Sequence, residues 1–254
     1  MAVRLLIMLC GLKLVIGEHE GFIVGGDYVD SVKDFPHVAA LYIYHSEGEG
    51  DNFCGSSILN QKILLTAAHC LLDDVVKVTA FVGSLDKKMG KLHRIDRYQI
   101  HKRWDINTAS NDIALVRLKK PLSLGTEVKR VILMKKPPKV KIAEVAGWGV
   151  TDEVNNIDTN LLKYTKQKLW TLKECRTVLP DAPDGTICGG ENNVKKNFAS
   201  YGDSGSGLIV NKNIIVGIGS FKVPETTTSL LVYTDVRHFY NWILVESRRL
   251  ACSE

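Results

Sequence analysis

Short apolar or alternating runs recur along most of this chain, and clusters rich in glycine, proline, asparagine and charged residues separate them. Eight such runs predict β-strands, at residues 38–44, 63–66, 78–82, 113–118, 142–146, 207–210, 214–218 and 230–233. The separating clusters include residues 47–52, 135–139 and 180–185. Many short strands with turn signals between them are typical of sandwiches and barrels. The pattern therefore predicts an all-β fold, with residues 121–138 able to link two lobes.

The pattern changes to helical spacing near the C-terminus. Apolar side chains recur there every three or four residues, at Val236, Phe239, Tyr240, Ile243 and Leu244. This spacing predicts a helix over residues 236–250. Thr234 or Asp235 can cap its first turn, and Arg248 and Arg249 suit the negative end of its dipole.

The first seventeen residues have the pattern of a secretory signal peptide. Arg4 supplies a positive charge, residues 5–16 are mainly apolar but include Lys13, and Gly17 offers a small residue near the cleavage point. This stretch is shorter than the roughly 18 residues that a membrane span requires. A buried amphipathic helix is the alternative. We expect residues 1–17 to be removed and the protein to be secreted and extracellular.

Composition narrows the class of protein. The chain has 254 residues, of which 45% are hydrophobic and 24% are charged. These ordinary globular values exclude collagen-like and disordered classes. The net charge is +5, but the lysines and arginines are scattered. That distribution favours a solvated basic surface over a nucleic-acid site, so we expect neither a nucleic acid nor a membrane as partner.

Secretion gives the cysteines a specific meaning. The chain has six: Cys10, Cys54, Cys70, Cys175, Cys188 and Cys252. The first leaves with the signal peptide, so five remain. Cys54 lies close to Cys70 in sequence, as Cys175 does to Cys188, and an extracellular chain would oxidise such pairs. Zinc is the competing interpretation, but CxxC spacing is absent. Cys252 is left over near the C-terminus.

Three motifs carry residues that could perform chemistry. Leu-Thr-Ala-Ala-His-Cys contains His69, Asn-Asp-Ile-Ala-Leu contains Asp112, and Gly-Asp-Ser-Gly contains Ser204. Each alone has an ordinary structural explanation: a core histidine, a turn residue and a tight loop. Together, in the order His, Asp, Ser, they are typical of a serine nucleophile activated by a histidine base that an aspartate orients.

With further segments, these motifs resemble the chymotrypsin-like serine proteases, and the resemblance is nearest to secreted insect proteases of the trypsin and scolexin type. The further segments are Ile-Val-Gly-Gly at 23–26, Cys-Gly-Ser at 54–56, Gly-Trp-Gly at 147–149 and Val-Tyr-Thr at 232–234. The resemblance implies an all-β fold of two six-stranded antiparallel β-barrels with a C-terminal helix. It implies lobes of about residues 27–118 and 139–235, with the triad in the cleft between them.

The resemblance also assigns roles. His69 would accept the proton of Ser204 and donate it to the leaving amine, while Asp112 would orient the imidazole. The backbone N–H groups of Gly202 and Ser204 would form the oxyanion hole, each contributing on the order of 3 kcal/mol.

Activation follows the same resemblance. Cleavage before Ile23 would free an ammonium group that pairs with Asp203, which makes residues 18–22 a short propeptide and 23–254 the peptidase domain of a zymogen. The bond to be cut follows Phe22, whereas many relatives have arginine or lysine there.

The pocket for the substrate residue before the scissile bond (the P1 residue) departs from the family pattern. Phe198 stands where trypsins carry aspartate, Ser200 replaces a bridging cysteine, Phe221-Lys222 replaces Trp-Gly, and Leu231 replaces a wall glycine. The backbone of residues 220–222, beginning with Ser220, would pair with an extended substrate. We expect a shortened pocket that prefers medium-sized apolar or aromatic P1 residues. An acidic preference is the alternative, and it requires the Lys222 ammonium to point into the pocket.

Other function classes have less support. A secreted protease homologue that binds partners without cutting is the main alternative, but all three triad residues are present. A metal-dependent hydrolase lacks an HExxH motif, and the basic segment 86–88 does not suit calcium. We therefore expect no metal or cofactor, a monomer, and protein or peptide substrates, with protease inhibitors as possible partners.

Overall fold

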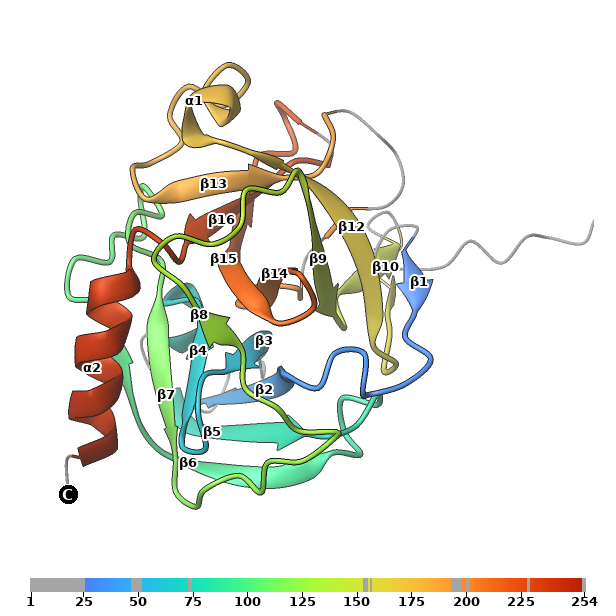
Figure 1. Ribbon diagram of the computed structural model, residues 1–254, viewed down its shortest axis with the longest axis vertical. Helices are drawn as coiled ribbons and strands as arrows, with labels where there is room; N and C mark the ends of the chain where they lie inside the picture. The colour runs from blue at the N-terminus through green and yellow to red at the C-terminus, as the bar shows by residue number, and fades with distance from the viewer. Residues whose placement is uncertain are drawn as a thin grey trace, which may run out of the picture.

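The strands close into two six-stranded antiparallel β-barrels, one above the other in Figure 1. The structure is a computed structural model. It describes residues 26–46, 52–72, 75–152, 155, 157–192, 198–199, 202–227 and 229–252. The predicted all-β, two-barrel fold is confirmed. None of the described helices is both long and apolar enough to cross a membrane.

The strands of the first barrel bury aliphatic side chains in its core. Around the barrel, the strands follow the order β2 (Val38–His45), β3 (Asn52–Ile58), β4 (Ile63–Thr66), β7 (Ala114–Leu118), β6 (Lys91–Ile100) and β5 (Val75–Val82). Leu64 and Leu65 of β4 pair with Val116 and Leu115 of β7, and all four are fully buried. Burying each such side chain contributes roughly 1.5–3 kcal/mol. This pair of strands firmly supports the segments that follow β4 and precede β7.

The second barrel closes through β9, which pairs with both β12 and β14. Its strands follow the order β9 (Ile142–Gly147), β12 (Lys163–Trp170), β13 (Thr186–Gly189), β16 (Leu231–Asp235), β15 (Ile214–Lys222) and β14 (Gly207–Val210). Strand β8 (Ile132–Leu133) adds to this sheet by running parallel to β15. Strands β10 (Val150–Asp152) and β11 (Ile157–Asp158) pair in a separate two-stranded sheet.

The N-terminal end of the described chain belongs to the second barrel. Strand β1 (Asp27–Tyr28) pairs with β12, although the sequence places these residues in a first lobe over 27–118. The Nζ atom of Lys163, on β12, lies 4.5 Å from the ring centroid of Tyr28. A cation is attracted to an aromatic face, so this contact helps to hold β1 against β12.

The C-terminal helix begins later than predicted. Helix α2 spans Tyr240–Cys252, not residues 236–250. The preceding residues form a turn because Val236 N–H donates to the Val216 carbonyl of β15 (3.1 Å), and Asp235 Oδ1 accepts from Arg237 N–H (2.9 Å). Val236 is nevertheless buried, so the apolar spacing reported a real core contact but misplaced the start of the helix.

Helix α2 packs back onto the first barrel, beside β7 in Figure 1. Its Ile243 and Leu250 join the core of that barrel. Arg117 of β7 donates a hydrogen bond to the Leu250 carbonyl (3.0 Å). After the last strand of the second barrel, the chain therefore returns to the first barrel, where α2 packs.

Two disulfides are present, and they are the two pairs inferred from sequence. Cys54–Cys70 joins β3 to the short 3₁₀ turn η1 (His69–Leu71). Cys175–Cys188 joins α1 (Leu172–Cys175) to β13. Helix α1 was not predicted, although Thr171 and Glu174 form a capping box at its start, a pattern visible in the sequence. Cys252 is free and exposed, and Cys10 lies outside the described residues.

Burial of His37 predicts a loss of stability in acid. Its side chain is buried against Phe35, and burial lowers its pKa to about 4. The unfolded chain would take up this proton near pH 6.5. Between these values only the unfolded state binds the proton, so the free energy of unfolding falls as the pH drops from about 6.5 towards 4.

Urea unfolding of the parent and His37→Phe at pH 7.5 and 4.5 tests this. The variant should lose less free energy of unfolding on acidification than the parent does. Lys173→Gln is the control, because Lys173 is exposed on α1 and is not a histidine, so this change should leave the loss as it is in the parent. Equal losses in the parent and His37→Phe would contradict the prediction.

Candidate active site

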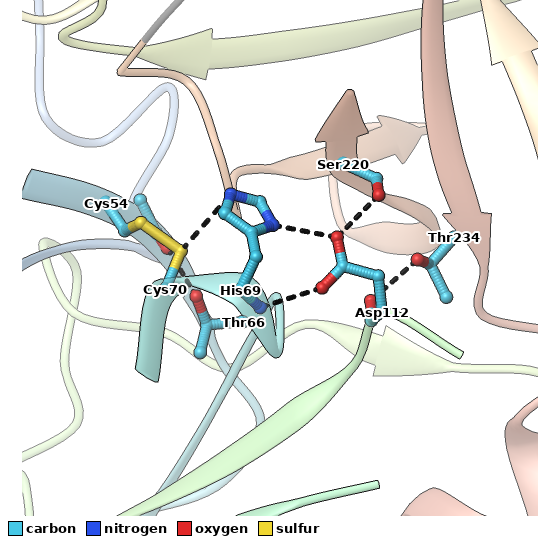
Figure 2. Close-up of polar contacts among 8 residues, drawn as sticks. Cys54, Thr66, His69, Cys70, Asp112, Ser220 and Thr234 are labelled. Carbon is cyan, nitrogen blue, oxygen red and sulfur yellow. Dashed lines mark hydrogen bonds and ion pairs between the residues drawn. A yellow bond between two sulfur atoms is a disulfide. The ribbon is translucent and has the colours of Figure 1, made fainter. Parts of the chain in front are cut away.

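A buried carboxylate, Asp112, organises the candidate site. It precedes β7, and its side chain is 1% exposed. Its Oδ1 accepts from the His69 backbone N–H (2.9 Å), and its Oδ2 lies 2.8 Å from His69 Nδ1. Oδ2 also accepts from Ser220 Oγ at 2.5 Å (Figure 2). A buried charge is tolerated only where donors satisfy it, and three donors converge here.

The Asp112 contact determines which nitrogen of His69 can act as a base. A carboxylate only accepts hydrogen bonds, so His69 Nδ1 carries the hydrogen. In a neutral ring, Nε2 is then the acceptor. The side chain of His69 is 27% exposed, and the ring lines a cavity. The geometry therefore presents an unprotonated nitrogen next to a partly accessible space.

The local fold fixes His69 from the other side. Residue 69 begins the turn η1 after β4, and the next residue, Cys70, is tied to Cys54 on β3. Thr66, the last residue of β4, donates from Oγ1 to the Gly55 carbonyl of β3 (2.9 Å). Figure 2 shows the ring between Cys70 and Asp112.

The same cluster has to be considered as a metal site. Cys54, His69 and Cys70 place possible ligand atoms within 4.8 Å of one another. Both sulfurs belong to one disulfide, however, and a metal ligand must be a thiolate. The cluster therefore does not suit a metal ion.

Ser204 lies on a loop whose shape requires glycine. Gly202 and Gly205 have φ angles of +87° and +78°, in the left-handed region that glycine adopts without strain. The Ser204 carbonyl accepts from Gly55 N–H of the first barrel (2.8 Å), and Gly205 N–H donates to the Gly219 carbonyl of β15 (2.8 Å). The loop is therefore attached to both barrels.

The close contact between the barrels also requires Gly55 itself. A Cβ atom at that position would lie 2.0 Å from Ser206 Oγ, which no side chain could tolerate without displacement of the loop. The Cys-Gly-Ser segment at 54–56 is thus explained: the cysteine holds the histidine turn, and the glycine admits the serine loop.

His69 and Ser204 line one cavity of about 300 Å³, together with Gly219, Ser220, Phe221, Lys222 and Leu231. Within the described part of the chain, no hydrogen bond joins Ser204 Oγ to His69 Nε2. Catalytic hydrogen bonds are often loose without substrate and tighten when it binds. Four of the five predicted pocket residues line this cavity. The fifth, Phe198, is buried, and its ring centroid lies 4.4 Å from Lys222 Nζ.

Asp203, the predicted activation residue, is also buried. Its Oδ1 accepts from Gly149 N–H (3.0 Å), and a Cβ atom on Gly147 would fall 2.1 Å from that oxygen. The Gly-Trp-Gly segment therefore forms part of the carboxylate's surroundings. Burial, and secondarily the Asp203 charge, raises the pKa of Tyr233. The predicted partner Ile23 and residue Ser200 lie outside the described residues.

Sequence reasoning missed two contacts to Asp112. Ser220 was expected only at the substrate wall, yet its hydroxyl donates to the Asp112 carboxylate. Thr234 Oγ1 donates to the Asp112 carbonyl (2.6 Å). Both hydroxyls are buried, and most buried hydroxyls are hydrogen-bonded. That is the signal which could have identified them.

A register shift in β15 explains how Ser220 reaches Asp112. Gly219 pairs with Tyr233 of β16 and Phe221 with Val232, so Ser220 is an extra residue in the ladder. Such a bulge redirects side chains. It turns Ser220 towards the first barrel at the point where β15 borders the cavity.

The fold and these motifs match a known family. The family model described as Trypsin matches residues 23–243, so the chain belongs to the trypsin family of serine endopeptidases. Hypodermin-B of Hypoderma lineatum is 31% identical over 94% of this chain and 96% of its own length. Trypsin epsilon of Drosophila erecta is 29% identical over 95% and 96%. Granzyme B of Rattus norvegicus is 29% identical over 94% and 97%.

Solved structures agree on the fold. The structure of HL collagenase has a TM-score of 0.76 and 25% identity, and covers 88% of this chain and 98% of its own. The scabies mite inactivated protease paralogue S-D1 has a TM-score of 0.75 and 21% identity over 87% and 95%.

Removing the Ser220 hydroxyl tests its part in holding Asp112. A hydrogen bond to a charged group contributes about 1.5–3 kcal/mol, so Ser220→Ala should lower kcat about tenfold or more, with KM less affected. Ser220→Thr, which keeps a hydroxyl, should recover part of the loss. Unchanged steady-state kcat in Ser220→Ala would contradict this role.

Proposed function

We propose that this chain is a secreted serine endopeptidase that hydrolyses peptide bonds through an acyl-enzyme formed on Ser204. The observation that carries the proposal is the Asp112–His69 pair, which leaves Nε2 as the acceptor nitrogen of a ring that lines the same cavity as Ser204. The two disulfides and the signal-like residues 1–17 support secretion.

The chemistry follows from the protonation states. A serine hydroxyl is a weak nucleophile near neutral pH and requires a base. As Ser204 Oγ attacks the scissile carbonyl, His69 Nε2 takes its proton, and the Asp112 carboxylate stabilises the imidazolium. His69 then donates that proton to the departing amine. In the second half, His69 takes a proton from water, the hydroxide attacks the ester, and Ser204 recovers its proton.

The oxyanion of each tetrahedral intermediate is assigned to the backbone N–H groups of Gly202 and Ser204. The positive φ of Gly202 supports this assignment, because it lets the loop turn sharply before the nucleophile. Preorganised donors of this kind contribute on the order of 3 kcal/mol each to stabilising the transition state.

The substrate partner is a protein or peptide chain, as in the family. The lining of the cavity supports a P1 residue other than lysine or arginine, since Lys222 contributes the same charge. Sequence reasoning favoured medium-sized apolar or aromatic P1 residues.

An inactive homologue that binds partners is the alternative function. The fold alone does not decide, since the structural neighbour S-D1 is described as an inactivated paralogue. The presence of all three triad residues and the Asp112–His69 pairing favour the enzyme.

Replacing the nucleophile tests the proposal. Ser204→Ala should lower kcat on a peptide substrate by at least about 10³-fold, with an unchanged midpoint of thermal unfolding. Hydrolysis at the parent rate by the alanine variant, or no hydrolysis by activated parent protein, would overturn the proposal.

Activation supplies a second test. We propose that the active chain starts at Ile23, whose ammonium group pairs with Asp203. The burial of Asp203 supports this role. Removing one partner of a buried ion pair lowers the stability of the folded state by about 3–5 kcal/mol. Protein starting at Ile23 should therefore be active, whereas protein starting at Glu18 and the Asp203→Asn variant should not. N-terminal sequencing of active material checks this, and any start other than Ile-Val-Gly-Gly would refute it.

A further inference from the structure

We propose that Lys222 is the specificity-determining residue of the cavity and that it selects an acidic side chain, aspartate or glutamate, at P1. This inference rests on the proposed function, because it names the substrate class of the same site. It replaces the apolar preference favoured by the sequence alone.

The first step is the direction of the lysine side chain. Lys222 ends β15, where it pairs with Leu231 of β16, and both side chains line the cavity. Its Nζ lies 4.4 Å from the ring centroid of Phe198, which is 2% exposed. The ammonium group therefore points inward to a buried aromatic face. An acidic preference at P1 requires the Lys222 ammonium to point inward, and this orientation meets that requirement.

The second step is the fixed position of the charge. Lysine side chains usually extend into water. The face of Phe198 offers this ammonium a site, because a cation over an aromatic ring is attracted more strongly as water is excluded. The bulge at Ser220 fixes the backbone on the N-terminal side of Lys222, since Ser220 is held by Asp112. The charge thus has a defined place before any substrate binds.

The third step is the balance of charge around the cavity. The seven described lining residues include one permanent cation, Lys222, and no carboxylate. His69 Nδ1 and Ser220 Oγ are already directed at Asp112. A substrate carboxylate would form a charge-assisted hydrogen bond with the ammonium. A lysine or arginine would be repelled by the Lys222 ammonium.

The size of the space points the same way. The lysine stem, Phe221 and Leu231 share a cavity of about 300 Å³ with the two catalytic side chains. A large aromatic P1 residue would have to share this space with the lysine side chain and would offer its ammonium no opposite charge. A carboxylate on a short stem would approach the ammonium without displacing it.

The decisive experiment uses a set of peptides that differ only at P1, with Glu, Gln, Leu, Phe or Arg at that residue. Glu and Gln have nearly the same shape, so their ratio reports charge alone. Activated parent protein should cleave the Glu peptide with a kcat/KM at least tenfold above that for Gln. It should cleave the Arg peptide worst.

Three variants separate charge from shape. Lys222→Met keeps the length of the side chain without its charge and should bring the Glu-to-Gln ratio near one. Lys222→Glu should reverse the order, with Arg cleaved better than Glu. Lys173→Met, an exposed lysine on α1, is the matched control and should keep the parent ratio.

The inference is overturned if the parent ratio of Glu to Gln is near one, if Lys222→Met keeps the parent ratio, or if Leu or Phe is cleaved best. With hydrolysis observed, each of these results leaves the endopeptidase proposal standing.

A binding measurement covers the opposite case. In Ser204→Ala, titration calorimetry should show a product peptide ending in Glu binding at least tenfold more tightly than one ending in Gln, and Lys222→Met should abolish the difference. If the parent hydrolyses nothing but this binding difference is found, the charge selection stands and the endopeptidase proposal fails. Equal binding of the two peptides overturns the inference.

Discussion

The structure depends on the satisfaction of one buried carboxylate at the junction of the two barrels. Asp112 enters the junction from the first barrel, as does His69. The remaining contacts come from the second barrel, where Ser220 donates to its carboxylate and Thr234 to its carbonyl. Burying a charge without such partners would be strongly unfavourable. The barrels must therefore dock in this arrangement for Asp112 to be stable, and the same docking sets the His69 ring.

The loop that carries Ser204 is also held by contacts between the two barrels. Gly55 N–H donates to the Ser204 carbonyl across the junction, and the absence of a side chain at Gly55 lets Ser206 approach. The proposed base and the proposed nucleophile thus lie on separate barrels and meet at one interface. This explains why a two-barrel fold is suited to a triad whose members lie far apart in sequence.

Specificity is a more local property of this fold. The fold is shared with HL collagenase and with the inactivated scabies mite protease paralogue S-D1, so function must be argued from the site. Here the differences lie on the end of β15 and on Phe198. The described contacts of Asp112 do not include Lys222, so we expect a change of side chain at residue 222 to leave them in place.

Sequence reasoning predicted the strands that bury aliphatic residues and missed those that do not. In β6, Lys91, Arg94 and Asp96 are exposed and one residue, His93, is buried, so the strand lacks an apolar face. Strand β3 buries the small residues Gly55, Ser56 and Ser57, which carry no hydrophobic signal.

The sequence analysis also failed to predict two further strands, for related reasons. Strand β12 buries Lys163 and Gln167, both polar, and β13 has one aliphatic side chain, Ile187, between Thr186 and Cys188.

The site shows the same division between local and distant information. The three motifs are local, and the structure places His69, Asp112 and Ser204 around one junction. The contacts that hold Asp112 are not local: Ser220 lies 108 residues away in sequence and Thr234 lies 122 away. No pattern of neighbouring residues contains that information. The direction of the Lys222 side chain likewise depends on the packing of Phe198, 24 residues earlier in the chain.

The central claim is that docking of the barrels makes His69 the base for Ser204. The rate at which a phosphonofluoridate labels Ser204, followed by mass spectrometry, tests it most directly. The account predicts one adduct per chain, on Ser204. In His69→Ala the rate should be at least about 10³-fold lower. An adduct on another residue, no adduct, or the same rate without His69 would contradict the account.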